Sequence, residues 1–356
     1  MDNSVLRLKA GSLDLAFDPA VGNIRQFSVA GRGILHRAHW VGTEQAQAAG
    51  SVIDAHLAGD FLAAPFGASD LVNDPPHGWS ANSPWALKSH NQSATDAQMV
   101  LALERPVMGA QITKEITLRA AQPVLYQRHR IAGGTGGLTF AHHPMIRVSG
   151  GDHIAVSPKR AALTPEEPLE PAHLLACPAR STELTRFPSK GGQAIDLSYY
   201  PQSVGHEDFV TLVEADTEGL GWTAVSRARE GDIVIFVKDS RVMPVTMFWM
   251  SNGGRGYAPW DGRHVGVLGV EDGCAAGAAG HRAALGDNAV AREGVATALT
   301  LGAGVEHVLR HAIAVIAQPE GWRGVADIRF EDDRMRIIGQ GGEVLFLPFE
   351  TAFFAS

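Results

Sequence analysis

Apolar and polar residues alternate from the start of the chain, and this period of two predicts β-strands. In residues 12–18 the apolar side chains occupy every second position, as a half-buried strand requires. A turn with proline and glycine separates this segment from a second predicted strand at 24–29. Segments 111–118 and 124–131 are rich in β-branched residues and predict an antiparallel hairpin.

Later segments extend the same pattern into a larger β architecture. Residues 232–237 and 245–250 are continuous apolar runs, which are typical of central strands covered on both faces. Residues 321–356 predict a β-meander, and 275–285 is the best candidate for a short helix. Segment 305–316 also satisfies helical spacing, but glycines just before it favour a strand. The predicted fold class is all-β, a large antiparallel β-sandwich with few short helices.

The sequence predicts a single domain over 1–356, because no repeat, linker or low-complexity tract interrupts it. Long loops are expected around residues 40–95 and 157–208. No apolar run approaches the roughly 20 residues that cross a bilayer, so we expect no membrane span. Residues 1–4 lead directly into a strand pattern without the features of a secretory signal, and we therefore expect a cytoplasmic protein.

Charge and cysteine content exclude several classes of protein. The net charge of -8 is spread along the chain, without a basic block that would follow phosphates, so nucleic acid is not an expected partner. Cys177 and Cys274 are too few for a disulfide framework and lack the spacing of metal ligands.

The first candidate for chemistry is the segment 75–85, which contains His77, Trp79 and Trp85. Its prolines and glycine indicate a loop, and loops carry function on rigid β scaffolds. Aromatic faces stack on pyranose rings while an imidazole binds a hydroxyl group, so this segment suits a sugar cleft. The alternative is that the tryptophans belong to the core and His77 is solvated.

The second candidate is the pair His142 and His143, followed by Pro144, at the end of a predicted strand. Adjacent residues of a strand face opposite ways, so only one of the two imidazoles can enter a given cleft. The same geometry prevents both from binding one metal ion, and no carboxylate lies at metal-ligand spacing. We expect no metal site.

The third candidate is Glu271, which follows the apolar segment 265–270 and precedes Asp272 and Gly273. A carboxylate at the end of a buried strand is partly desolvated, so its basicity rises and it becomes a usable proton acceptor. In the alternative interpretation Asp272 and Gly273 form an ordinary turn and Glu271 is exposed.

Together these segments resemble the aldose 1-epimerase family, the galactose mutarotase-like proteins, and they follow the family's order. The family's His-Gly-aromatic segment is similar to His77-Gly78-Trp79 with Trp85. Its second histidine motif is similar to His143-Pro144, and the strand that ends in its catalytic glutamate is similar to 267–271. The resemblance spans most of residues 5–317 and implies the family's β-sandwich, sometimes called a supersandwich.

The resemblance implies an isomerase that interconverts the anomers of a free sugar by general acid and base catalysis. Glu271 would be the general base, His143 the general acid at the ring oxygen, and His77 the donor that holds the substrate. A carboxylate and an imidazole can share this work at neutral pH. No metal or organic cofactor is needed, and the expected partner is a small sugar in carbohydrate metabolism.

This chain departs from the family pattern at two places. The family's Asn-Arg pair before the first histidine is missing from 64–69, so a substrate contact is lost or replaced. Ser80 and Ala81 stand where members that act on sugar phosphates carry an arginine, which argues against a phosphorylated hexose. Further substrate-binding candidates are Asp208, Trp79, Phe66 and Trp249.

Two other functions remain open at this point. One is a carbohydrate-binding protein without catalytic activity, which the missing Asn-Arg pair favours. The other is a carbohydrate-active lyase or hydrolase on the same fold, because a fold alone does not choose a reaction. A hydrolase would need a second carboxylate facing Glu271 across the sugar. The sequence also leaves open whether the chain forms a homodimer.

Overall fold

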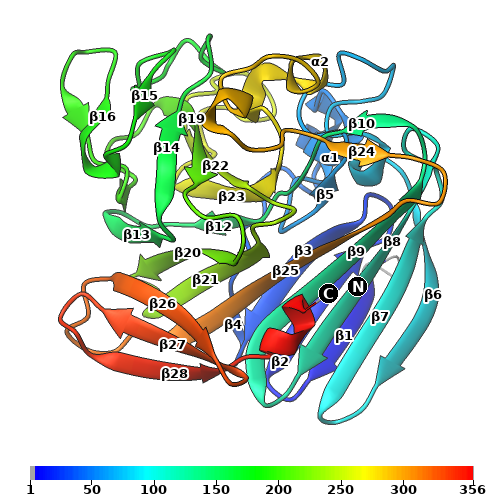
Figure 1. Cartoon of the computed structure of the whole chain (residues 1–356). Helices are drawn as coiled ribbons and strands as arrows, with labels where there is room; N and C mark the ends of the chain where they lie inside the picture. The colour runs from blue at the N-terminus through cyan, green and yellow to red at the C-terminus, as the bar shows by residue number, and fades with distance from the viewer. Residues whose placement is uncertain (1–4, 356) are drawn as a thin grey trace.

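The computed structural model describes residues 5–355; residues 1–4, where the sequence predicts no secretory signal, and Ser356 lie outside them. The described chain is built from antiparallel sheets, of which two large ones pack face to face (Figure 1). The predicted fold class is therefore confirmed. No described helix is long and apolar enough to span a bilayer.

The larger sheet has nine strands and contains the predicted hairpin. The segment with ambiguous periodicity, 305–316, forms most of its central strand β25 (Glu306–Ala317), which pairs on both sides. In spatial order the strands are β18 (Tyr199–Tyr200), β13 (Asp152–Val156), β20 (Leu220–Arg227), β21 (Asp232–Asp239), β25 (Glu306–Ala317), β9 (Gln122–Gly133), β8 (Ala110–Arg119), β7 (Asp96–Leu103) and β6 (Trp85–Gln92).

The second sheet has eight strands and carries the residues that matter for function. Every residue of its three central strands is buried, as expected for strands covered on both faces. In order the strands are β15 (Arg180–Ser181), β14 (Lys159–Leu163), β19 (His206–Glu214), β22 (Val245–Asn252), β23 (Val267–Cys274), β11 (Phe140–His142) and β5 (Leu62–Ala63), with β12 (Met145–Arg147) also paired to β23.

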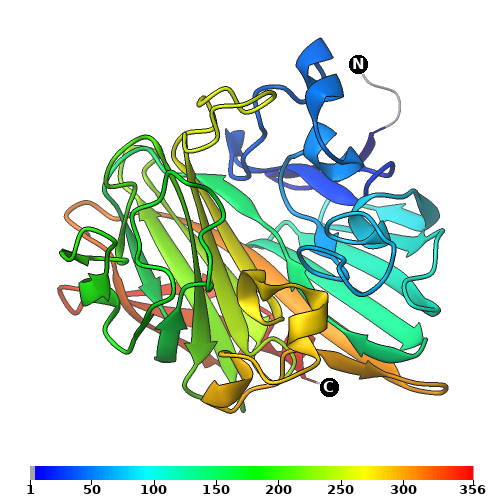
Figure 2. The ribbon, with the colours of Figure 1, turned by 90° about the horizontal axis from the view of Figure 1, so that it is seen from above.

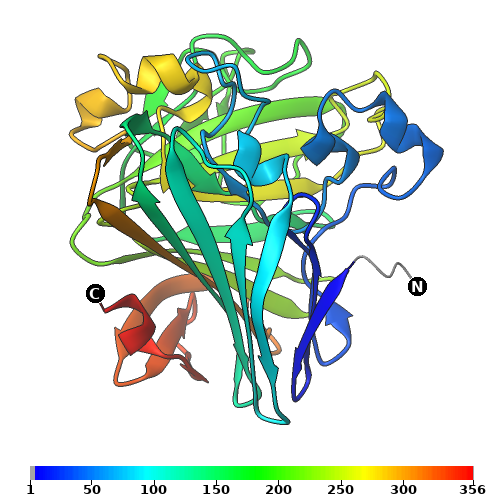
Figure 3. The ribbon, with the colours of Figure 1, turned by 90° about the vertical axis from the view of Figure 1, so that its right-hand side faces the viewer.

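The main core lies between these sheets, and a four-stranded N-terminal sheet completes the inner layer. This small sheet packs against β6, β7 and β8 (Figure 3). Its strands are β1 (Leu6–Ala10), β2 (Leu13–Asp18), β3 (Asn23–Val29) and β4 (Arg32–Gly33). Leu13, Leu15 and Phe17 enter the same core, as the period of two predicts, and Ile24 and Phe27 join them from β3, where a register shift breaks the alternation.

The predicted C-terminal meander is present and covers the outer face of the nine-stranded sheet. Apolar residues of the meander and of β9, β20, β21 and β25 form one buried cluster. The meander therefore hides an apolar face that would otherwise meet water. Its strands are β26 (Val325–Glu331), β27 (Arg334–Gly339) and β28 (Val344–Pro348), followed by the short helix η6 (Thr351–Phe354).

Loops and short helices cover the outer face of the eight-stranded sheet (Figure 2). The predicted helix at 275–285 is only partly correct, because it is split into η4 and α2 around Gly280, which has a φ of 92°. The predicted loop 40–95 ends earlier, since β6 begins at Trp85. The remaining elements are η1 (Glu44–Ala48), α1 (Val52–Ala55), η2 (Trp79–Ala81), β10 (Gly136–Leu138), η3 (Leu184–Arg186), β16 (Phe187–Pro188), β17 (Ala194–Ile195), η4 (Gly277–Ala279), α2 (His281–Ala284), η5 (Ala291–Glu293) and β24 (Leu299–Leu301).

Candidate active site

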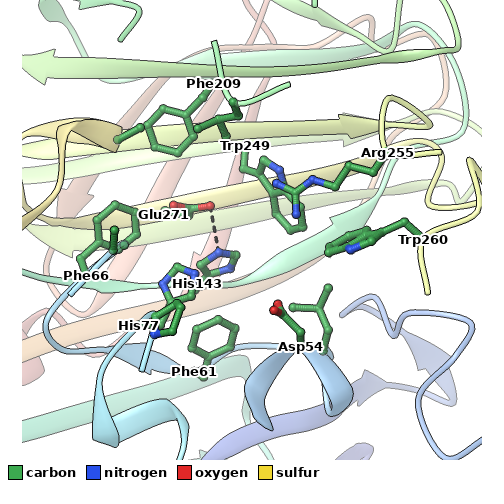
Figure 4. A pocket seen from close by; sticks show the side chains of 16 residues that line it. Asp54, Phe61, Phe66, His77, His143, Phe209, Trp249, Arg255, Trp260 and Glu271 are labelled. Atoms are coloured by element: carbon green, nitrogen blue, oxygen red, sulfur yellow. Dashed lines mark ion pairs between the residues drawn. The ribbon is translucent and has the colours of Figure 1, made fainter. Parts of the chain in front are cut away.

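A pocket of about 300 Å³ opens on the outer face of the eight-stranded sheet, beneath the covering loops. This volume lies at the lower end of the range for small-molecule sites. Figure 4 shows aromatic rings around a polar centre made by two imidazoles and one carboxylate. The lining side chains include Asp54, Phe61, Phe66, His77, His143, Phe209, Trp249, Arg255, Trp260 and Glu271.

The floor of the pocket follows from strand register. Phe209 of β19 lies opposite Trp249 of β22, which lies opposite Gly269 of β23, two residues before Glu271. Residues two apart on a strand point to the same face, so these side chains share the outer face. A Cβ atom at Gly269 would lie 3.0 Å from Glu271 Oε1, and the glycine therefore leaves room for the carboxylate.

The position of Glu271 differs from the predicted strand end. β23 continues to Cys274, so Glu271 projects from within a buried central strand and is 1% exposed. The turn interpretation is therefore wrong. Gly273 does not turn the chain; it lets β11 approach, since a Cβ atom there would lie 2.2 Å from the Phe140 carbonyl oxygen.

His143 is held from both its backbone and its ring. Its backbone N–H donates to the Phe61 carbonyl oxygen at 2.9 Å and to Asp60 Oδ1 at 3.0 Å. Its ring stacks on Phe61 with centroids 4.5 Å apart and planes at 16°. His143 thus faces the pocket, while His142 points into the interior between the sheets, as opposite strand faces require.

His77 reaches the pocket from a tightly constrained loop. Its φ is 64°, a left-handed conformation that is uncommon outside glycine and is often found at functional sites. Its N–H donates to the Gly67 carbonyl oxygen and its own carbonyl accepts from the Ala64 N–H. The next residue, Gly78, also has a positive φ, and a Cβ atom there would lie 1.9 Å from the Ala64 carbonyl oxygen.

Glu271 and His143 form a direct contact, with Oε1 and Nε2 3.1 Å apart (Figure 4). Burial raises the pKa of Glu271 well above its usual range. Burial also lowers the pKa of His143 to about 3, and the nearby His77 adds to this. At neutral pH the pair therefore holds one proton, and burial favours the uncharged arrangement in which Glu271 carries it.

Several polar atoms of the pocket have no protein partner among the described residues. They are His77 Nδ1, His143 Nδ1, Glu271 Oε2 and Arg255 Nε, and each is buried. Buried polar groups are nearly always hydrogen-bonded, and exceptions are frequent where a ligand binds. The residues that carry these atoms line one pocket from different segments of the chain, which is the arrangement of a polar ligand site.

The structure brings together His77, His143 and Glu271, the three residues predicted to carry chemistry. Phe66 and Trp249, predicted as cleft walls, line the same pocket. Their roles toward a substrate remain predictions.

Two other predicted contacts are not supported by the geometry. Trp79 does not line the pocket. The Arg105 guanidinium lies 3.3 Å from the Trp79 ring centroid, and Trp79 Nε1 donates to Asp74. Asp208 lies on the inner face of β19, opposite to Phe209, and its carboxylate accepts the Leu174 and Leu175 N–H groups. That carboxylate also contacts His206 Nδ1 at 2.6 Å. It therefore serves the fold.

The sequence gives no motif for two charged residues of the pocket, Asp54 and Arg255. Asp54 lies on α1, a four-residue helix whose N-cap is Ser51. Arg255 lies in a glycine-rich loop between β22 and β23, where composition predicts only a turn. Trp260 from the same loop and Phe61 beside β5 were likewise missed, because isolated aromatic residues are more often core.

A second buried polar cluster lies behind the pocket, between the sheets. Asp60, His142 and His311 place ligand atoms within 4.8 Å of one another, and all three are fully buried. The His142 and His311 rings stack at 4.3 Å with planes 17° apart. Imidazole lone pairs lie in the ring plane, so two stacked rings cannot both point at one ion. At least one of the two rings would have to turn before both could bind the same ion.

The inner cluster instead continues as a chain of buried contacts. His311 Nε2 lies 3.1 Å from Asp272 Oδ2, and Asp272 Oδ1 lies 3.3 Å from Lys238 Nζ. Lys238 in turn contacts Glu214 at 2.9 Å. Acidic and basic groups alternate, which compensates part of the cost of burying each charge.

Comparisons with known proteins identify the fold. No protein-family model matches the sequence, and no curated protein sequence matches it. A putative aldose 1-epimerase from Escherichia coli K12 is similar in structure, with a TM-score of 0.60 and 16% identity over 88% of this chain and 99% of that one. A putative mutarotase from Salmonella typhimurium has a TM-score of 0.59 and 12% identity over 89% and 95% of the two chains.

A galactose mutarotase-like protein from Clostridium acetobutylicum is also similar, with a TM-score of 0.56 and 11% identity over 88% of this chain and 95% of that one. At such identities the likeness concerns the fold rather than the reaction. The chain has the fold of the aldose 1-epimerases and galactose mutarotase-like proteins, as its sequence motifs predict.

Proposed function

We propose that the protein interconverts the anomers of a free sugar, as an isomerase of the aldose 1-epimerase type. The observation that carries this proposal is the 3.1 Å contact between Glu271 and His143 at the centre of an aromatic pocket, with His77 beside them. A proton acceptor and a proton donor within one sugar's reach are what anomer exchange requires.

The reaction opens and recloses a hemiacetal. Glu271 removes the proton of the anomeric hydroxyl while His143 gives a proton to the ring oxygen, and the bond between the anomeric carbon and the ring oxygen breaks. The open-chain aldehyde rotates about its adjacent carbon–carbon bond, and the ring recloses on the other face as both protons return. His77 donates to a substrate oxygen and stabilises the charge that develops there.

The proton of the Glu271 and His143 pair must move before this reaction. Burial favours the proton on Glu271, whereas the assigned roles need a carboxylate at 271 and an imidazolium at 143. Transfer across the 3.1 Å contact produces that reactive form without any proton from solvent. Sugar hydroxyl groups that pair with the unpaired atoms of the site would lower the cost of this charged state.

The experiment that tests the proposal is a screen of anomerically pure aldoses, followed by polarimetry. We expect the protein to accelerate the approach of α-D-glucose or α-D-galactose to anomeric equilibrium far above the spontaneous rate, without metal ions or cofactors. Spontaneous rates with every aldose tested, together with retained sugar binding, would instead support a carbohydrate-binding protein without activity.

One observation keeps a hydrolase or lyase as the second candidate. Asp54 is a second carboxylate that lines the pocket with Glu271, and glycoside hydrolysis uses two such groups. Incubation with oligosaccharides and analysis of the products distinguishes this candidate, because an anomer-exchanging enzyme releases no shorter sugar.

A further inference from the structure

The pocket has a second polar region, formed by Arg255 and Asp54. Figure 4 shows both on the side of the pocket away from Phe66 and His77, next to Trp260. Neither residue belongs to the motifs that the sequence shares with the aldose 1-epimerases. This region lies where a ring bound through its anomeric end at Glu271 would present its remaining hydroxyl groups.

Arg255 is held in place by groups behind it. Its Nε lies 3.0 Å from Glu207 Oε1 and 3.3 Å from Glu170 Oε1, and its guanidinium carbon lies 4.4 Å from the Trp260 ring centroid. Glu207 is itself fixed, because it accepts hydrogen bonds from Trp249 Nε1 at 2.6 Å and from Ser251 Oγ at 3.0 Å. The guanidinium is therefore oriented before any ligand arrives.

The two terminal nitrogens of Arg255 remain available to a ligand. No hydrogen bond joins them to a protein atom within residues 5–355, and the buried Nε, although it is close to both glutamates, also has no hydrogen-bond partner there. Asp54 offers the complementary group. Its Oδ2 accepts from Ser51 Oγ at 2.8 Å, and its side chain lines the same pocket as His77 and Glu271.

The charge balance decides which ligand this region fits. Arg255 is the one cationic side chain among the described lining residues, whereas Asp54 and Glu271 are acidic. Glu170 and Glu207 contact Arg255 from behind and already compensate its charge. A phosphate or carboxylate would gain little from such an arginine and would be repelled by Asp54. Hydroxyl groups, which both accept and donate, match a guanidinium facing a carboxylate.

We propose that Arg255 and Asp54 recognise the hydroxyl groups of an uncharged sugar, with Arg255 as hydrogen-bond donor and Asp54 as acceptor, in place of the missing Asn-Arg pair. This inference rests on the proposed function. It assigns to the two residues a role in affinity and substrate choice, and none in the proton transfers.

The test compares the unaltered protein with Arg255→Met, which keeps the apolar stem against the tryptophans and removes the donors. Binding of D-glucose and D-galactose is followed by tryptophan fluorescence, since Trp249 and Trp260 line the pocket. We expect Arg255→Met to raise Kd and KM about 10- to 100-fold, as the loss of one or two charge-assisted hydrogen bonds predicts, with kcat within about 3-fold. Asp54→Asn should raise Kd about 5-fold. Arg263→Met, an exposed arginine of the same loop, is the control and should change nothing.

Monodeoxy sugars separate recognition from a merely structural role. For the analogue that lacks the hydroxyl bound by Arg255, the unaltered protein and Arg255→Met should bind equally well, whereas the other analogues should keep the difference. D-glucuronate and D-glucose 6-phosphate should bind more weakly than D-glucose. Unchanged Kd values in Arg255→Met would overturn the proposal. Tighter binding of the two anionic sugars than of D-glucose, lost in Arg255→Met, would also overturn it. Neither result would affect the assignment of anomer exchange. An unaltered protein that neither binds nor turns over any sugar would remove the proposed function as well.

Discussion

Glu271→Gln is expected to abolish most anomer exchange while the protein stays folded and still binds sugar. Glutamine has nearly the same shape and can still contact His143, but it cannot accept a proton. Loss of a positioned general base lowers rates roughly 10²- to 10⁴-fold, so kcat should fall by that factor with Kd within about 3-fold. Polarimetry with anomerically pure D-glucose or D-galactose measures the rate, and tryptophan fluorescence measures binding.

The control for this variant is Glu115→Gln, which removes a carboxylate of β8 that pairs with Arg128 outside the pocket. It should equilibrate anomers as fast as the unaltered protein. If Glu271→Gln does the same, Glu271 is not the base and the catalytic assignment is lost.

Mild acid is expected to destabilise the protein strongly. Burial lowers the pKa of His142 to about 4, and burial lowers the pKa values of His129 and His264 well below the usual range. In the unfolded chain these groups titrate near 6.5. A histidine whose pKa is lower in the folded state favours the folded state when the pH is above its pKa in the unfolded chain. This contribution is lost as the pH falls toward the pKa in the folded state. Between pH 7 and pH 5 each of the three histidines should lower the free energy of unfolding by about 2 kcal/mol.

Two buried carboxyl groups raise the free energy of unfolding as the pH falls from 7 to 5. Burial raises the pKa of Glu207 and that of Glu271, so each takes up a proton in the folded state first. The effect of Glu271 roughly cancels that of His143, and Glu207 offsets part of the rest. His36, whose pKa burial lowers to about 4, adds to the loss, and we therefore expect the free energy of unfolding to fall by several kcal/mol from pH 7 to pH 5.

Urea denaturation at a series of pH values measures this slope. His129→Leu removes one buried imidazole that has no hydrogen-bond partner on either ring nitrogen within the described chain, and it should flatten the slope by about 2 kcal/mol. His307→Gln, at a more exposed position of β25, is the control and should leave the slope unchanged. A free energy of unfolding that stays level or rises toward pH 5 would contradict the expected burial of neutral imidazoles.

The sequence predicts the β architecture well because the hydrophobic pattern responds directly to burial. Segments such as 12–18 and 111–118 must place alternate side chains in the core, and their period of two reports that requirement. For 305–316 periodicity alone leaves helix and strand open. The strand forms because β9 and β21 pair with it on both sides, a long-range fact that no local pattern contains.

The candidate site was only partly predictable, for reasons that also concern long-range contacts. The motifs around His77, His143 and Glu271 lie in three distant segments, and the resemblance to a family supplied their association. Gly273 indicated a turn, yet it serves the close approach of β11 to β23. Asp208 points to the inner face of β19, and the sequence around it does not reveal this direction. Arg255 enters the pocket from a loop, and its side chain contacts Glu170 and Glu207, which are distant in the sequence.

The decisive experiment is a crystal structure of the protein soaked with D-galactose or D-glucose. We expect one sugar in the pocket, with its anomeric hydroxyl within hydrogen-bond distance of Glu271 and its ring oxygen within that distance of His143. A sugar bound elsewhere on the molecule, or one whose anomeric carbon points away from both side chains, would contradict this expectation.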